Sequence, residues 1–329
     1  MKTIMMAATQ PGSVELAADI IKSGGLVAFP TETVYGLGGN ALDATACAKI
    51  YAAKGRPSDN PLISHISDIE MLSQIVKNVP RGTFSLIDKF WPGPLTIIFP
   101  AAGGGTVGVR MPANPVATRL ISLSGVPIAA PSANVSGRPS PTSARHVLAD
   151  LDGKIDMILD GGRCLHGLES TVIDCTTDVP TILRPGAVTK EMIEALIGPV
   201  GLVTEAGDDA PRAPGMKYRH YAPKAKLTVV VGEQVAVSSK ILQLAADITH
   251  PNFAIMAATQ NQSRYASHTM LDMGQNPQEI AANLFRLLRQ CDEMGLEEVF
   301  VEGVAESDLG MAIMNRLKKA ASYNIIDTK

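Results

Sequence analysis

Apolar residues recur at helical spacing along the first two hundred residues and alternate there with short buried runs. The apolar positions of residues 14–21 fall on one face of a helix, which Gly24-Gly25 ends, and residues 26–29 form a continuous apolar run typical of a strand. The same patterns predict helices at residues 43–53, 68–77, 84–90, 115–124, 143–151 and 189–197, and strands at residues 62–66, 95–99, 107–111, 126–130, 155–159, 171–174 and 181–183. This alternation predicts an α/β domain with a mixed, twisted sheet.

The last hundred residues predict a second, smaller α/β unit. Strands are expected at residues 227–231, 253–257 and 298–301, and helices at residues 234–246, 277–291 and 308–321. The unit is predicted to be Rossmann-like, although no G-x-G-x-x-G follows any of its strands. Proline, glycine and aspartate mark residues 204–226 as a linker. We therefore expect a catalytic domain at residues 1–203, a linker at 204–226 and an accessory domain at 227–329.

Composition and charge exclude several classes of function. The chain has 329 residues, a net charge of −3 and only 4% aromatic residues, which argues against a protein that holds RNA tightly by itself. Its cysteines, Cys47, Cys164, Cys175 and Cys291, form no C-x-x-C pair, so neither a zinc site nor a redox pair is indicated. Sparse cysteine, no signal-peptide pattern and no apolar run of membrane-spanning length together predict a cytoplasmic protein.

A short loop at residues 54–65 collects the most chemistry. It carries Lys54, Arg56, Asn60 and His65, and its glycine and two prolines interrupt any helix. A forked guanidinium and a point-charge ammonium on a stiff loop suit a multiply charged anion. Taken alone, the same pattern also fits an ordinary solvated loop.

Other motifs of the first domain give that loop a context. In chain order they are Pro30-Thr-Glu-Thr-Val-Tyr-Gly-Leu-Gly38, Lys54-Gly-Arg56 with Asn60-Pro-Leu62, Trp91-Pro-Gly-Pro-Leu-Thr96, Val109-Arg-Met-Pro112, Ala130-Pro-Ser-Ala-Asn134, Glu169-Ser-Thr171 and Leu183-Arg-Pro-Gly186. Together they resemble the threonylcarbamoyl-AMP synthases, whose paired Lys-x-Arg and Ser-x-Asn signature stands here as Lys54/Arg56 and Ser132/Asn134. The segment Pro214-Gly-Met-Lys-Tyr-Arg-His-Tyr-Ala-Pro223 is similar to the linker of the long, two-domain form.

The resemblance implies an N-terminal domain with a large open cavity and a defined reaction. L-threonine, bicarbonate and ATP would give threonylcarbamoyl-AMP and pyrophosphate, which makes the protein a nucleotidyltransferase. The product would feed the threonylcarbamoyl modification of the adenosine next to the tRNA anticodon, through a separate transferase complex. Mg²⁺ is expected with ATP, held mostly by phosphate oxygens and water, so its protein ligands stay unnamed.

The resemblance also implies roles for individual residues. The expected catalytic residues are Lys54, Arg56, Ser132 and Asn134, with the two cations as clamps for phosphates and the carbamate. The expected threonine site is Thr33, His65, Arg110, Ala130 and Ser170. The expected ATP site is Arg56, Asn60, Thr106, Ser132, Ser140, Arg184 and Tyr221. Arg110 would pair with the threonine carboxylate. Without the resemblance, Pro-Ser-Ala-Asn could equally be a simple turn.

The linker carries an unusual set of side chains. Residues 216–221 combine two tyrosines, a histidine and two cations, so we hypothesise that they close over the first-domain cavity as a lid. The alternative function is an RNA-binding or ribosome-associated module of the same fold. A carbamoyl-transfer enzyme of hydrogenase maturation is disfavoured, because those proteins add an acylphosphatase-like region and Cys-rich zinc motifs. The C-terminal domain has no clustered catalytic residues in its sequence, which favours a structural or docking role.

Overall fold

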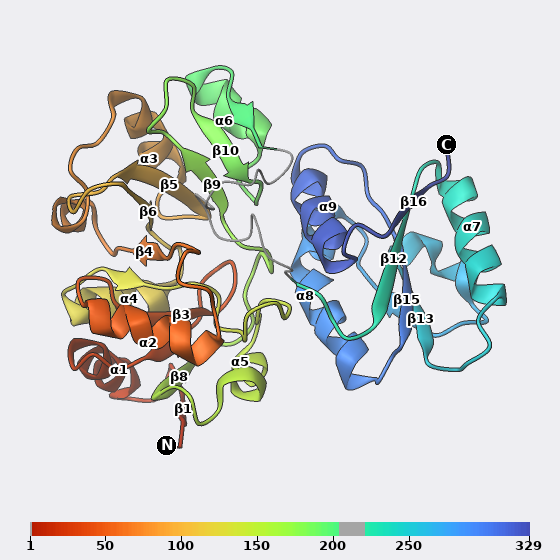
Figure 1. The fold of residues 1–329 in the computed structure, drawn as a ribbon, viewed down its shortest axis with the longest axis horizontal. Helices are drawn as coiled ribbons and strands as arrows, with labels where there is room; N and C mark the ends of the chain where they lie inside the picture. Colours follow the sequence, from red (N-terminus) through yellow and green to blue (C-terminus); the bar gives the residue numbers. More distant parts are fainter. Residues whose placement is uncertain (1, 204–220) are drawn as a thin grey trace. The chain divides into compact units, whose positions relative to one another are not determined.

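The computed structural model describes residues 2–203 and 221–329. These residues form two compact units, one made of residues 2–136 and 140–203 and the other of residues 137–139 and 221–329 (Figure 1). The short segment 137–139 therefore clusters with the second unit, although the expected catalytic domain contains it. It is held there by the hydrogen bond of 3.1 Å from the amide of Ala222 to the carbonyl of Gly137.

The first unit is built on one mixed sheet of eleven strands. In chain order these are β1 (Ile4–Ala7), β2 (Val27–Phe29), β3 (Gly36–Asn40), β4 (Ile63–His65), β5 (Leu95–Pro100), β6 (Thr106–Arg110), β7 (Ile128–Ala129), β8 (Met157–Asp160), β9 (Thr171–Asp174), β10 (Thr181–Arg184) and β11 (Gly201–Leu202). Their order in the sheet is β1-β8-β2-β3-β7-β4-β6-β5-β9-β10-β11. Parallel pairs such as β4 with β6 stand beside antiparallel pairs such as β5 with β6, so the predicted mixed α/β class is confirmed.

Local sequence explains where the helices of this unit begin and end. They are α1 (Ser13–Lys22), α2 (Ala44–Lys54), α3 (Phe84–Phe90), α4 (Pro115–Ser124), α5 (Ala144–Leu151) and α6 (Lys190–Ile197), with 3₁₀ turns η1 (Ile69–Gln74) and η2 (Arg81–Thr83). The carboxylate of Asp43 caps α2 by accepting from the amide of Thr45 at 2.8 Å. Gly55 ends the same helix at φ 60°, a conformation that glycine adopts without strain. This ending sets Lys54 at the last position of α2.

One predicted helix is wrong. Residues 68–77 form only the short 3₁₀ turn η1, although Asp68 caps it as expected by accepting from the amide of Met71. The reason is tertiary, because the chain after the turn pairs with the β5–β6 hairpin. Val76 bridges Ala101, and the amide of Lys77 donates to the carbonyl of Pro100 at 2.9 Å.

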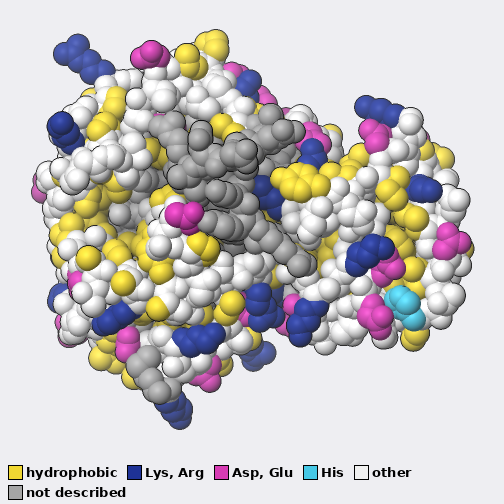
Figure 2. Space-filling model, in the orientation of Figure 1, with side chains coloured by type: hydrophobic (Ala, Val, Ile, Leu, Met, Phe, Trp, Pro, Cys, Tyr) yellow, Lys and Arg dark blue, Asp and Glu magenta, His cyan; other side chains and the backbone are white. Residues whose placement is uncertain are grey.

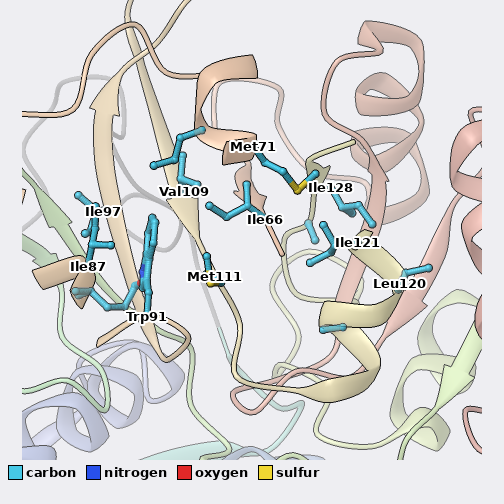
Figure 3. Packing of buried hydrophobic residues seen from close by; sticks show 14 of the residues in the cluster. Ile66, Met71, Ile87, Trp91, Ile97, Val109, Met111, Leu120, Ile121 and Ile128 are labelled. Carbon is cyan, nitrogen blue, oxygen red and sulfur yellow. The ribbon is translucent and has the colours of Figure 1, made fainter. Parts of the chain in front are cut away.

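A hydrophobic core fixes the sheet against its helices. Figure 3 shows Ile97 of β5 and Val109 of β6 within a cluster of buried side chains that includes Trp91 and Met111. The indole nitrogen of Trp91 donates to the carbonyl of Leu95 at 2.7 Å, so its one polar atom is satisfied inside the core. Burial of one isoleucine, valine or methionine side chain stabilises the folded state by about 1.5–3 kcal/mol. The core therefore fixes β6 through Val109 and the chain just after β4 through Ile66, and with them the strand ends that carry Arg110 and His65.

The second unit is a parallel sheet of five strands in the order β14-β13-β15-β12-β16. The strands are β12 (Lys226–Val231), β13 (Phe253–Ala257), β14 (Met270–Asp272), β15 (Glu298–Glu302) and β16 (Ile325–Asp327). The helices are α7 (Gln234–Ala246), α8 (Pro277–Glu293) and α9 (Leu309–Ala320), with a 3₁₀ turn η3 (Thr259–Tyr265). The sequence patterns missed β14 and β16, because each is a three-residue edge strand with at most one buried side chain.

Glu302, at the end of β15, joins several loops of this unit. Its side chain is buried, and its two oxygens accept four hydrogen bonds, from Gln234 (2.8 Å), Tyr265 (2.8 Å), Asn261 (2.9 Å) and the amide of Ala258 (3.1 Å). A carboxylate with four donors uses its full accepting capacity.

We expect Glu302→Ala to destabilise the second unit by about 3 kcal/mol, because it leaves four donors without their acceptor. The measurement is amide hydrogen exchange in β12, β13 and β15 of the whole protein, which isolates this unit. The control is Glu298→Ala on the same strand, whose ion pair of 2.8 Å involves the largely exposed Lys226 and should contribute little. Equal exchange rates in the two variants would contradict the structural role of Glu302.

Candidate functional site

Lys54 lies beneath the turn that follows β7. The residue is 2% exposed, and its ammonium donates to the backbone carbonyls of Ser132 and of Asn134, the latter at 2.6 Å. In return, the amide of Ser136 donates to the carbonyl of Lys54 at 2.9 Å. The end of α2 and the Ser132–Asn134 turn are thus fastened together, which brings both halves of the paired signature into one place.

Hydrogen bonds within the turn and from neighbouring segments hold it in place. The hydroxyl of Ser132 donates to the side-chain oxygen of Asn134 at 2.6 Å, and the Asn134 amide nitrogen donates to the carbonyl of Val135 at 2.8 Å. The amide of Ala133 donates to the carbonyl of Tyr35 at 2.8 Å, next to β3. Because α2 and β3 both hold this segment, it is more than a simple surface turn, and the side chains of Ser132 and Asn134 are fixed before any ligand binds.

Arg56 and Asn60 close the loop between α2 and β4. The Arg56 guanidinium donates to the carbonyls of Asn60 at 3.2 Å and of Pro61 at 3.0 Å, and it is 8% exposed. The side-chain oxygen of Asn60 is buried and has no hydrogen-bond partner among the described residues. An unpaired buried acceptor costs about 1–3 kcal/mol, so such a group is a candidate ligand contact. The loop is therefore stiff, as predicted from the sequence, because Arg56 donates to backbone carbonyls of the same loop.

Arg110 is the centre of a second buried cluster, at the end of β6. Its guanidinium donates to the carbonyl of Gly93 at 3.2 Å and to the hydroxyl of Thr33 at 2.8 Å. It also forms an ion pair of 2.7 Å with Glu32, and both side chains of that pair are 5% exposed. Thr33 in turn lies 2.8 Å from the hydroxyl of Thr31. Two nitrogens of the guanidinium are therefore hydrogen-bonded, whereas Nη2 has no partner of hydrogen-bond geometry among the described residues and faces Glu32 only as an ion pair.

Glu32 is the residue of this cluster that the motifs did not assign. Burial by itself would raise the pKa of its carboxyl, but the positive charge of Arg110, helped by nearby backbone N–H groups, outweighs burial, and the pKa is lowered. The carboxyl is therefore ionised at neutral pH and balances Arg110. A signal was present in the sequence: Glu32 is the single charged residue between positions 23 and 42, three residues after the end of an apolar run. A buried arginine needs such a counter-charge.

His65 stands beside Arg110, because the parallel register of β4 and β6 makes the two residues partners. The imidazole is 4% exposed, and its Nδ1 has no hydrogen-bond partner among the described residues. Burial, and then the positive charge of Arg110, lower the pKa of His65 to about 3. At neutral pH the side chain is consequently an uncharged ring with one nitrogen available to a ligand.

The lowered pKa of His65 predicts a pH effect on stability. The unfolded chain takes up a proton at a pKa of about 6.5, whereas the folded chain resists protonation until about pH 3. The stability that is present above pH 6.5 should therefore fall as the pH drops, by up to about 1.4 kcal/mol per unit. Urea denaturation at pH 7 and pH 5, followed by the fluorescence of Trp91, measures this, and His65→Gln should flatten the profile. An equal change in the free energy of unfolding between pH 7 and pH 5 in both proteins would contradict the lowered pKa of His65.

Two further predicted residues meet at the start of β9. The hydroxyl of Ser170 lies 2.7 Å from that of Thr96. Arg184 donates to the carbonyl of Ser170 at 3.0 Å and to its hydroxyl at 3.2 Å. Next to them, Ser140 donates to the carboxylate of Glu169 at 2.5 Å. Ser170 was expected to bind threonine and Arg184 to bind ATP, so this contact is a point where both predicted sites meet.

Three predicted residues remain, Ala130, Thr106 and Tyr221. The amide of Ala130 donates to the carbonyl of Ile63 at 2.8 Å, so Ala130 joins β7 to β4. Thr106 is exposed at the opposite end of β6 from Arg110, and no described contact brings it to another predicted residue. Tyr221 belongs to the second unit, where its ring packs against Phe285 with 5.0 Å between the centroids. Residues 216–220 of the hypothesised lid lie outside the described residues.

The fold and these clusters together define an α/β protein whose first unit holds buried groups of charged and polar side chains. Comparison with known proteins agrees. A family model described as "Telomere recombination" matches residues 19–186, and one described as "Threonylcarbamoyl-AMP synthase, C-terminal domain" matches residues 188–322. The curated threonylcarbamoyl-AMP synthase of Pyrococcus abyssi is 48% identical over 325 residues, which cover 95% of each chain. That of Bacillus subtilis is 43% identical over 332 residues, covering 97% of this chain and 95% of the relative.

Solved structures give the same result. The crystal structure of P. abyssi Sua5 complexed with L-threonine has a TM-score of 0.92 and 45% identity, covering 99% of this chain and 98% of that one. The chain belongs to the threonylcarbamoyl-AMP synthase family, a family of enzymes. Within residues 2–203 and 221–329, no helix is both long enough and apolar enough to cross a membrane.

Proposed function

We propose that the protein is an L-threonylcarbamoyladenylate synthase. It would condense L-threonine, bicarbonate and ATP, supplied as its magnesium complex, into threonylcarbamoyl-AMP and pyrophosphate, and would thus act as a nucleotidyltransferase. The observation that carries the proposal is the pairing of two prepared clusters in one domain: the Lys54-anchored Ser132–Asn134 turn, and the Arg110–Thr33–His65 group. Whole-chain identity to synthases of that name supports it.

The reaction needs positioning more than a strong catalytic base. The amine of threonine attacks bicarbonate to form a carbamate, and water leaves. A carbamate oxygen then attacks the α-phosphorus of ATP, and the bond to the pyrophosphate oxygen breaks. A carbamate oxygen is already a competent nucleophile, so the protein's task is to align the two partners and to stabilise charge at phosphorus. This need fits a site made of ordered cations and amides.

In this proposal the Arg110 cluster binds threonine. The guanidinium faces the carboxylate of the substrate, and Thr33 holds the guanidinium in place. Glu32 balances the arginine, so the buried site carries little net charge before threonine arrives. The neutral imidazole of His65 offers Nδ1 to a substrate hydroxyl or amine without adding a second positive charge. A threonine-bound relative with the same fold supports this assignment.

The Lys54 cluster would serve the nucleotide. Lys54 places its charge directly under the Ser132–Asn134 turn, so the turn is an electropositive platform for phosphate oxygens. Arg56 stiffens the neighbouring loop and presents Asn60, whose side-chain oxygen awaits a donor such as a ribose hydroxyl or an adenine amine. Ser140, Arg184, Thr106 and Tyr221 are proposed as further ATP contacts.

The proposed product is an intermediate for tRNA modification in the cytoplasm. A separate transferase complex would pass the threonylcarbamoyl group to the adenosine next to the anticodon. The alternative, an RNA-binding module, is less well supported, because on the face that Figure 2 shows the basic side chains are interspersed with acidic ones. RNA retention that is sensitive to salt and needs no ATP would favour that alternative.

Incorporation of labelled bicarbonate tests the proposed reaction. The protein is incubated with ¹³C-bicarbonate, ATP, Mg²⁺ and L-threonine, and the products are separated and weighed by mass spectrometry. The proposal predicts threonylcarbamoyl-AMP carrying one ¹³C atom, and the label should vanish when threonine is omitted. A threonyl-AMP product without the label would instead mean that the threonine carboxylate is activated, and would refute the proposed reaction.

A further inference from the structure

The second unit contains a cavity of about 660 Å³ at the carboxyl edge of its sheet. Residues at or just beyond the ends of all five parallel strands line it, including Gly232 after β12 and Glu302 at the end of β15. These two strands are neighbours, yet the helices that follow them, α7 and α9, lie on opposite faces of the sheet (Figure 1). In open α/β sheets, ligands bind at this type of switch point. The volume is in the range of small-molecule sites.

The polar lining of the cavity is organised by Glu302. The nitrogens of the Gln234 and Asn261 amides are engaged by its two oxygens, at 2.8 and 2.9 Å. The Gln234 nitrogen also donates to the hydroxyl of Ser238 at 3.3 Å, so Gln234 has only its carbonyl oxygen left to offer, an acceptor, whereas Asn261 keeps one N–H donor besides its carbonyl oxygen. Asp327 and Glu306 add carboxylates to the rim, and the half-exposed Glu306 is also paired with Lys318 at 2.6 Å. The lining thus favours a ligand that carries several hydrogen-bond donors.

Phosphate does not suit this cavity. The start of α7 is already capped by the carboxylate of Glu233, which accepts from the amides of Val235 and Ala236. The start of α8 is capped by Asn276, and Glu279 lies beside it. Carboxylates at helix N-termini occupy the positions that phosphate would take and repel it. The described lining holds three carboxylates and one lysine, and no arginine.

We propose that this cavity binds an uncharged nucleoside, that is, a base and ribose without phosphate. Apolar side chains such as Met273 and Ile280 offer a surface for the faces of a base, and the glutamine and asparagine side chains match the polar edge of a base. The carboxylates at the rim accept from ribose hydroxyls, as acidic residues do at strand ends of other α/β sheets. The site would give the second unit a ligand of its own, and its existence does not depend on the reaction proposed for the first unit.

Methyl NMR of the whole protein tests the proposal. Adenosine, guanosine, cytidine and uridine are each added to about 5 mM, and each is compared with its 5′-monophosphate. We expect at least one nucleoside to shift the methyl signals of Met273 and Ile280, and its monophosphate to bind there at least about tenfold more weakly. Met111, next to Arg110 in the first unit, reports separately on binding at that unit.

Two substitutions localise the effect. Gln275 lines the cavity and is exposed, so Gln275→Trp should fill the cavity without disturbing the core, and should weaken nucleoside binding at least about tenfold. Gln278 is also exposed and lies nearby on α8 but outside the lining, so Gln278→Trp should leave binding unchanged. The proposal is overturned if no nucleoside moves Met273 and Ile280, if a monophosphate binds there as tightly, or if both tryptophan variants behave alike.

Discussion

Lys54→Ala should lower the rate of threonylcarbamoyl-AMP formation about a hundredfold. The substitution removes the ammonium that donates to the carbonyls of Ser132 and Asn134, and leaves two buried acceptors without their donor. At about 1–3 kcal/mol for each unpaired buried group, the turn would shift to recover hydrogen bonds, and a loss of about 3 kcal/mol at the transition state corresponds to this factor. Steady-state pyrophosphate release at saturating ATP and threonine measures the effect.

Lys49→Ala is the matched control for this experiment. Lys49 is on the same helix and also donates to a backbone carbonyl, that of Gly24 at 2.7 Å, but it is exposed. Its loss should change the rate by less than about twofold. Lys54→Met, which keeps the apolar stem, separates charge from packing and should remain slow. A Lys54→Ala protein that is folded and turns over at the normal rate would remove the Lys54-anchored turn from the mechanism.

Arg110→Ala should raise the KM for threonine at least about a hundredfold while leaving the KM for ATP within about threefold. The guanidinium is the one group in the cluster that can pair with the threonine carboxylate, and Thr33 and Gly93 aim it. The substitution also leaves Glu32 ionised and buried without its partner, at a cost of about 3–5 kcal/mol in stability.

A second variant keeps this prediction decisive if Arg110→Ala fails to fold. Arg110→Lys retains the positive charge beside Glu32 but loses the fork that contacts Gly93 and Thr33 together. It should fold and still show a raised KM for threonine. Arg119→Ala, which breaks an exposed ion pair with Glu15, should behave like the unaltered protein. A normal KM for threonine in Arg110→Lys would place the threonine carboxylate elsewhere.

Much of the fold was predictable because its local signals agree with its tertiary packing. The apolar pattern of residues 84–90 gave α3 with its observed bounds, and Pro115 opens α4 as expected. The failures have tertiary causes. The helix expected at 68–77 is cut short where Val76 pairs with the β5–β6 hairpin. The strand β1 was missed because its four residues are mostly exposed and gain their order only by pairing with β8.

The candidate site was predictable as a set of motifs but not as a network. Motif order along the chain cannot reveal that Lys54 donates to backbone carbonyls, because those carbonyls belong to residues about eighty positions away. It likewise cannot reveal the pairing of Arg110 with Glu32, which depends on the strand exit before β3 reaching the end of β6. The sequence shows which side chains are available, whereas the pairing of strands in the sheet decides which of them lie in contact.

Pyrophosphate release in the presence of ATP and Mg²⁺ tests the proposed activity most directly. It is measured with both L-threonine and bicarbonate, with each alone, and with neither, in the unaltered protein and in Lys54→Ala. We expect release that requires both co-substrates and that falls about a hundredfold in the variant. Release that does not depend on threonine, or that is equal in the two proteins, would contradict the proposal that this chain makes threonylcarbamoyl-AMP at the site built around Lys54 and Arg110.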